Sequence, residues 1–97
     1  MVKIGWLDWK SDRVLHIAGH GVNPYEIEEA IKDKDRRIIK AGAAERNPSE
    51  TIYRVYGRTE AGRHLLGPLL KYENGTCALP LTARDMTKSE RRRYRKK

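Results

Sequence analysis

The spacing of apolar positions changes several times along the chain, and each spacing predicts a different element. Residues 2–6 form a short apolar run that predicts a first strand. Over residues 11–18 the apolar positions keep mostly to one side of a helix. The sequence Gly19-His20-Gly21 predicts the end of this helix, because glycine tolerates the left-handed conformation of a C-terminal cap. We therefore expect a strand followed by a short helix.

A second helix is predicted from strong start signals. Asn23 can accept from free backbone N–H groups, Pro24 suits the first helical position, and Glu26 can bond back to the cap. The apolar residues that follow at helical spacing are Ile27, Ala30 and Ile31. Each predicted helix thus has one apolar stripe, which is enough to cover one face of a sheet.

Beyond Asp33 the apolar positions alternate with the period of two that is typical of strands. Pro68 and Pro80 each remove a backbone donor, so we expect them at a sheet edge, a bulge or a strand end. The predicted strands and connections are strands over 36–40, 51–58, 63–72 and 76–83, a loop over 42–49, a hairpin turn at 60–62, and a type I′ turn at Asn74-Gly75.

The last element is predicted to be a basic helix. Residues Thr87 to Glu90 have the form of a capping box, and Arg91 to Lys97 would continue the helix. The element order is then a short N-terminal strand, two helices, an antiparallel sheet of three to four strands, and a basic C-terminal helix. This is an α+β plan with the helices on one face, in a single domain over residues 1–97.

Composition narrows the class of protein. A chain of 97 residues with 38% hydrophobic and 35% charged residues supports one small core and excludes two catalytic domains. No stretch reaches the roughly 18 apolar residues of a membrane helix, and the N-terminus does not resemble a secretory signal. The single cysteine, Cys77, cannot form an internal disulfide. We expect a cytoplasmic protein with no membrane partner.

The charge is uneven. Lysine and arginine number 21 against 13 acidic residues, a net charge of +8, and residues 84–97 carry +6 of it. A basic excess of this kind is typical of proteins that bind phosphate-rich partners. A solvated tail that aids solubility is the alternative.

Four pieces of the sequence, in one order, resemble the BrnT-type toxins of type II toxin-antitoxin modules, a branch of the RelE-like ribonucleases. They are Trp6 to Trp9 followed by a helix, the His20-Gly21-Val22 turn with its capped helix through Ala30, Tyr56-Gly57-Arg58-Thr59 with Gly62-Arg63, and Ala83 to Thr87 leading into Glu90 to Tyr94. The chain departs from that family where Gly67-Pro68 and Pro80 interrupt strands.

The resemblance implies a RelE-like toxin that cuts RNA to inhibit translation and growth. It also implies a partner, a BrnA-like antitoxin of the ribbon-helix-helix type, which would neutralise the toxin and bind operator DNA with it. RNA cleavage needs no metal or cofactor, because the 2′-hydroxyl of RNA lies beside the phosphate that it attacks. We therefore expect none, and the histidines His16, His20 and His64 are isolated from one another in the sequence.

Arginine suits the phosphate, because its planar guanidinium stays charged and can grip two oxygens. Arg58 and Arg84 lie at strand ends, and similarity to the toxin family points to the same pair as catalytic residues. From periodicity alone, both are ordinary surface arginines. His20 is the first candidate for proton transfer, since imidazole titrates near neutral pH. The alternative is a histidine that only caps its helix.

Further RNA contacts are expected from basic and aromatic residues. Tyr94, flanked by arginines, can stack an unpaired base, and His64 is a second candidate for proton transfer. The full set of predicted RNA-binding residues is Arg63, His64, Lys71, Arg91, Arg92 and Tyr94.

Three functions remain open from the sequence. The first is an endoribonuclease toxin. The second is a non-catalytic nucleic-acid-binding protein that acts as a corepressor with an antitoxin. The third is an interaction protein whose basic C-terminal helix docks an acidic partner.

Overall fold

The structure, a computed structural model, describes residues 4–43, 50–72 and 76–95. Its elements are β1 (Trp6–Leu7), α1 (Ser11–Gly19), α2 (Pro24–Lys32), β2 (Arg37–Ala43), β3 (Glu50–Arg58), β4 (His64–Tyr72), β5 (Cys77–Pro80), β6 (Arg84–Asp85) and α3 (Lys88–Arg95). The α+β class is confirmed. Among the described helices, none combines the length and apolar character needed to cross a membrane.

Some of the predictions fall outside the described residues. These are the Asn74-Gly75 turn, residues 44–49 of the predicted loop, residues 2–3 of the first strand and the last two residues of the C-terminal helix.

The described strands form one six-stranded sheet, so the expected count of three to four strands is wrong. The order is β1-β5-β4-β3-β2, with β6 also paired to β4. The predicted strand over 76–83 is shorter in the structure, where it is β5 and ends at Pro80, and the separate strand β6 begins just after the predicted range; β1 runs parallel to β5. A two-residue strand such as β6 has no periodicity for a sequence pattern to detect. The strand predicted over 36–40 continues as β2 to Ala43 through an irregularity between Lys40 and Gly42.

The two prolines lie where irregular pairing was expected. Pro80 is the last residue of β5. Pro68 lies in the middle of β4, at the point where the partner on one side changes from β5, paired at 69–71, to β6, paired at 65–66. The Pro68 carbonyl accepts from the Leu81 N–H on this side at 3.0 Å. The backbone nitrogen of Pro68, which lacks a hydrogen, therefore faces the same side, at the position where neither β5 nor β6 pairs with β4. The prediction is confirmed for Pro80. For Pro68 only the irregular pairing is found, because β4 is an inner strand that runs without a break through Gly67-Pro68, so the expected interruption of this strand is wrong.

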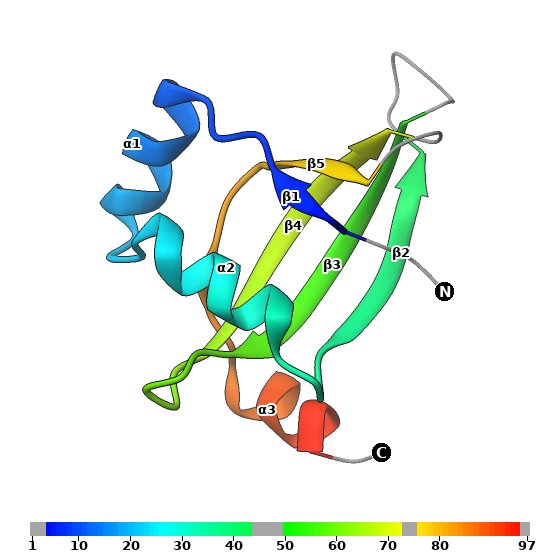
Figure 1. The fold of residues 1–97 in the computed structure, drawn as a ribbon. Coiled ribbons are helices and arrows are strands. Elements are labelled where there is room, and N and C mark those ends of the chain that lie inside the picture. Colours follow the sequence, from blue (N-terminus) through cyan, green and yellow to red (C-terminus); the bar gives the residue numbers. More distant parts are fainter. Residues whose placement is uncertain (1–3, 44–49, 73–75, 96–97) are drawn as a thin grey trace.

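Alternation along β3 and β4 separates the two faces of the sheet. Val55, Leu65 and Leu69 point to α1 and α2, where they form the main core with residues such as Ile17 and Ile27. Figure 1 shows α1 and α2 along one side of the strands, and α3 at the end where β3 meets β4.

The neighbouring positions on the same strands, Tyr56 and Leu66, point to the other face. There they pack with Met86 and Tyr94 of the C-terminal segment. The expectation that all helices share one face is therefore wrong for α3. Its single buried residue, Tyr94, is matched to apolar positions of the opposite face.

Candidate functional site

The turn between α1 and α2 is a Schellman motif that holds His20 in place. The N–H of Gly21 donates to the carbonyl of Ala18 at 2.9 Å, and the N–H of Val22 donates to the carbonyl of Ile17 at 3.2 Å. Gly21 has φ +75°, which the motif requires and which side chains rarely adopt. Val22 and Ile17 are both buried in the main core, so the backbone of the turn is anchored while the His20 side chain stays exposed.

A cleft of about 440 Å³ opens on the sheet face opposite α1 and α2. It gathers polar side chains from four separate segments: His20 from the turn, Arg54 and Tyr56 from β3, Arg84 from β6 and Glu90 from α3. The remaining wall is made of Leu66, Pro68, Thr82 and Ala83. The ring of His16 lies against that of His20, with centroids 4.9 Å apart in an edge-to-face arrangement. Two of the three predicted catalytic residues, His20 and Arg84, thus meet in one cleft.

Arg84 is held by Glu90 through two hydrogen bonds, of 2.8 and 2.9 Å. Glu90 also accepts the N–H of Thr87 at 2.8 Å, while the Thr87 hydroxyl accepts the Glu90 N–H at 3.2 Å, so the predicted capping box of α3 is confirmed. The bond from Arg84 and the bonds from Thr87 lower the pKa of Glu90 to about 2, against the opposing effect of burial. Glu90 is therefore an anion at neutral pH, and it aims the Arg84 guanidinium.

Arg58, the other predicted phosphate ligand, does not line this cleft. The register pairs Arg84 with Leu66 and Leu66 with Tyr56, so these three residues form one row across the sheet. On β3, Arg54 lies two residues before this row and Arg58 lies two residues after it. From strand spacing alone, the Cα atoms of Arg54 and Arg58 are each about 12 Å from the Cα atom of Arg84.

The C-terminal helix decides between the two arginines. The chain leaves β6 toward His64, since the N–H of Met86 donates to the His64 carbonyl at 3.0 Å. Tyr94 of α3 then packs beside the ring of His64, with centroids 5.5 Å apart, and His64 is the register partner of Arg58. The side of the row that holds Arg58 is therefore covered by α3, and the side that holds Arg54 stays open. Arg54 takes the place in the cleft that the sequence interpretation gave to Arg58.

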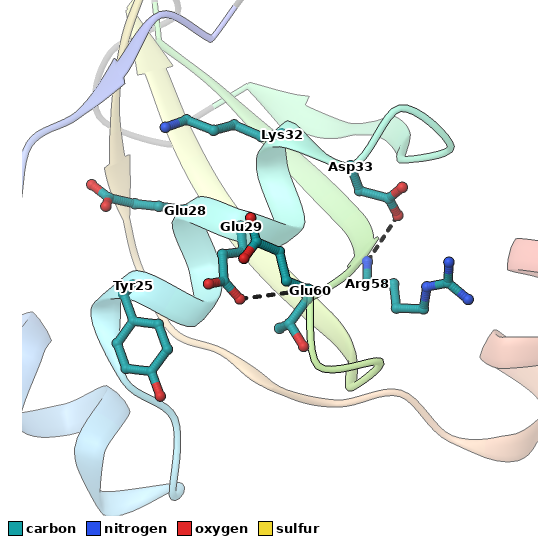
Figure 2. A pocket seen from close by; sticks show the side chains of 8 residues that line it. Tyr25, Glu28, Glu29, Lys32, Asp33, Arg58 and Glu60 are labelled. Carbon is teal, nitrogen blue, oxygen red and sulfur yellow. Dashed lines mark hydrogen bonds between the residues drawn. The ribbon is translucent and has the colours of Figure 1, made fainter.

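Arg58 instead borders a second cavity, of about 470 Å³, between α2 and the β3–β4 turn. Figure 2 shows the Arg58 side chain extending away from the carboxylates of Glu28 and Glu29. Its backbone N–H donates to Asp33 at 2.9 Å, and the Glu60 N–H donates to Glu29 at 3.2 Å. Four carboxylates line this cavity against two cations, Lys32 and Arg58, and this excess of negative charge opposes the binding of a phosphate.

Tyr94 is buried, with 6% of its surface exposed, and its hydroxyl donates to Asp33. Burial and this bond raise the pKa of Tyr94 to about 12. Burial also lowers the pKa of His64, and the nearby Arg91, Arg95 and Arg58 lower it further. Tyr94 thus works as the anchor of α3, and its ring is not open to stack a base.

Arg63 joins three segments around the cleft. Its guanidinium donates to the Gly21 carbonyl at 2.8 Å, to Glu26 of α2 at 3.2 Å and to Asp85 of β6 at 2.7 Å. The hydrogen bond with Asp85 is the main cause of a raised pKa for Arg63, and it lowers the pKa of Asp85 in turn. Gly21 follows His20 and Asp85 follows Arg84, so Arg63 sets the distance between two cleft residues. Its contacts make it a positioning residue.

Replacing Arg63 with methionine is expected to lower the free energy of unfolding by about 2 kcal/mol, because Glu26 and Asp85 lose their shared cation. Lysine should restore part of this stability, since an ammonium keeps the charge and loses the planar fork. Urea denaturation measures both values, with Arg92→Met on the exposed face of α3 as the control. If Arg63→Met weakened RNA binding at unchanged stability, the sequence assignment of Arg63 to RNA contact would be correct instead.

The other predicted RNA-binding residues are dispersed. Arg91 and Arg92 are exposed on α3. Lys71 is near the far end of β4, paired with Ala78 on the face that carries the main core, so it lies away from the cleft. The structure does not bring Lys71, Arg91 or Arg92 into the cleft with His20 and Arg84.

Sequence reasoning missed Arg54 and Glu90 as cleft residues. A signal for Arg54 was present, because Arg54, Tyr56 and Arg58 alternate on one strand and must share a face. Nothing local distinguished Arg54 from Arg58. Glu90 was assigned only to the capping box, where its second contact with Arg84 depends on the position of β6.

The fold and the cleft thus define a small α+β protein with a cationic, histidine-bearing cleft on one face of its sheet. No protein-family model matches the chain, and no curated protein matches it. Within the described residues there is no group of three or more His, Cys, Asp or Glu side chains arranged to hold a metal ion. The resemblance to BrnT-type toxins remains a hypothesis that rests on the quoted residues.

Proposed function

We propose that this protein is an endoribonuclease whose active site is the cleft formed by His20, Arg54, Tyr56 and Arg84. The observation that carries the proposal is the convergence of two arginines and an exposed histidine from three distant segments on one concave surface. Two guanidinium groups suit a phosphodiester, and an imidazole suits proton transfer near neutral pH. The net charge of +8 favours a polyanionic substrate.

The reaction needs few groups from the protein. The scissile phosphate would bind between Arg54 and Arg84, with charge on its oxygens stabilised by their N–H groups. The 2′-oxygen of RNA forms the new bond to phosphorus, and its proton passes to His20. The bond to the 5′-oxygen breaks, and this oxygen takes a proton from water. The products are a 2′,3′-cyclic phosphate and a 5′-hydroxyl, and His20 returns its proton to solvent.

Glu90 has a defined part in this scheme. Its carboxylate occupies two donors of Arg84 in the free protein, as a phosphate would. Glu90 therefore orients the arginine before the substrate arrives. A bound phosphodiester would then compete with Glu90 for these donors. This preorganisation costs affinity, because one carboxylate must be displaced or must share the guanidinium.

The RelE-like assignment and the antitoxin partner belong to the same proposal. They rest on the resemblance to BrnT-type toxins, with an antitoxin expected to cover the cleft and to bind operator DNA with the toxin. The alternative, a non-catalytic nucleic-acid-binding corepressor, would keep salt-dependent binding and release no product.

Incubation of the purified chain with a labelled single-stranded RNA tests the activity. The expected result is a product ending in a 2′,3′-cyclic phosphate, and no cleavage of a matched strand with a single 2′-deoxynucleotide at the cleaved position. Expression with and without the adjacent reading frame, followed by mapping of RNA 5′ ends, tests the partner. Cleavage of the 2′-deoxy strand at the same site would refute the proposed chemistry.

A further inference from the structure

A third cavity adjoins the proposed active cleft. It measures about 270 Å³ and is lined by Arg37, Ile39, Tyr56, Glu90, Arg93 and Tyr94. Tyr56 and Glu90 belong to both cavities, so the two are neighbours on one face of the sheet.

The register shows how the two cavities are connected. Arg84 of β6, Leu66 of β4, Tyr56 of β3 and Arg37 of β2 are successive partners, which places them in one row across the sheet. The row spans three strand separations, about 14 Å between the Cα atoms of Arg84 and Arg37. Arg84 lines only the first cleft and Arg37 only the third cavity, so a ligand that uses both arginines must extend past Tyr56 from one cavity into the other.

The chemistry of the third cavity differs from that of the first. Its apolar surface is made by Tyr56 and the half-exposed Ile39 (49%), with only the small exposed fraction of Tyr94 (6%), and its charged groups are the cations Arg37 and Arg93 and the carboxylate of Glu90. An aromatic and aliphatic surface between guanidinium groups is the combination that holds an unpaired base while its backbone is gripped. A charged carboxylate ligand would use the cations and leave the apolar surface exposed to water.

We propose that this cavity is a second nucleotide subsite, in which the base next to the scissile phosphate lies against Tyr56 and Ile39 while Arg37 and Arg93 hold the following phosphate. The inference rests on the proposed function, because it takes the first cleft as the site of cleavage. It identifies the substrate as single-stranded RNA that crosses the strands from β6 to β2, since a paired base could not enter the cavity.

Binding of a fluorescent hexanucleotide made of 2′-O-methyl RNA tests the subsite without cleavage. Arg37→Ala/Arg93→Ala is expected to weaken binding about tenfold and to reduce the slope of log affinity against log salt by about 1 to 1.5. The control is Lys40→Ala/Lys88→Ala, which removes two positive charges from exposed positions that line neither cavity. The control should weaken binding less than about threefold. With a dinucleotide probe, the binding affinities of the two double variants should differ little.

The outcomes separate this inference from the proposed function. Equal weakening by both double variants would mean unspecific attraction and would overturn the subsite. Unchanged RNA binding in Arg37→Ala/Arg93→Ala, together with loss of a co-expressed partner protein, would assign the cavity to a protein interface and also overturn it. If the hexanucleotide results hold while the wild-type chain cleaves no RNA, the subsite stands and the endoribonuclease proposal fails. Circular dichroism of each variant confirms that it is folded.

Discussion

Simultaneous replacement of Arg54 and Arg84 by alanine is expected to abolish measurable RNA cleavage. Loss of one preorganised donor to a developing oxyanion typically costs 10² to 10³ in rate, so each single variant should fall by about this factor. The double variant should lose somewhat less than the product of the two, because both groups act on one phosphate. Single-turnover cleavage of a labelled RNA measures the rates.

Two further variants make this test specific. Lys40→Ala/Lys88→Ala removes the same net charge at exposed positions outside the cleft and should keep cleavage within about threefold. Arg58→Ala separates the sequence assignment from the structural one, because Arg58 borders the acidic cavity beside α2. A large loss of cleavage in Arg58→Ala, with cleavage near the wild-type rate in Arg54→Ala, would show that the pair predicted from the sequence was correct.

The second large effect is expected from Gly57→Ala in β3. A Cβ atom at this buried position would lie 2.1 Å from the carbonyl oxygen of Ala30 in α2. The obstacle is backbone, so relief requires α2 to move away from the sheet. We expect a loss of about 3 kcal/mol or more in the free energy of unfolding, a large part of the 5 to 15 kcal/mol of a typical domain. The melting temperature should fall by at least about 12 °C.

Gly19→Ala at the end of α1 is the matched control. A Cβ atom there meets nothing within 4 Å, and the residue is exposed. Alanine favours helix over glycine, so stability should stay the same or rise by a few tenths of a kcal/mol. Thermal unfolding followed by circular dichroism compares the two. A Gly57→Ala variant as stable as Gly19→Ala would contradict the close packing of α2 on β3.

The sequence predictions were correct where an element depends on interactions between residues that are close in the chain. The start of α2 at Pro24, the cap of α3 by Thr87 and Glu90, and the end of α1 near Gly21 each depend on residues within a few positions of one another. The irregular pairing at Pro68 was also predictable, because a missing N–H constrains any sheet that contains it. Long alternating runs gave β3 and β4 for the same reason.

Errors occurred where pairing partners lie far apart in the chain. β1 and β6 are two residues each and exist only because β5 and β4 offer them free edges. The position of α3 depends on the fit of Tyr94 against Leu66 and Met86, a contact between segments that no spacing rule connects. The choice between Arg54 and Arg58 follows from that contact, so it was not available from the alternation of β3.

The sequence by itself determined that this is a small, cationic α+β protein, because charge, caps and periodicity are properties of the chain. It also pointed to His20, through the proton chemistry of imidazole, and to Arg84, through the resemblance to BrnT-type toxins, and both line the cleft. The tertiary structure alone decided that Arg54 and not Arg58 joins them. Register sets which side chains share a row across the sheet, and the docking of α3 on the face opposite α1 and α2 covers one side of that row and leaves the other open.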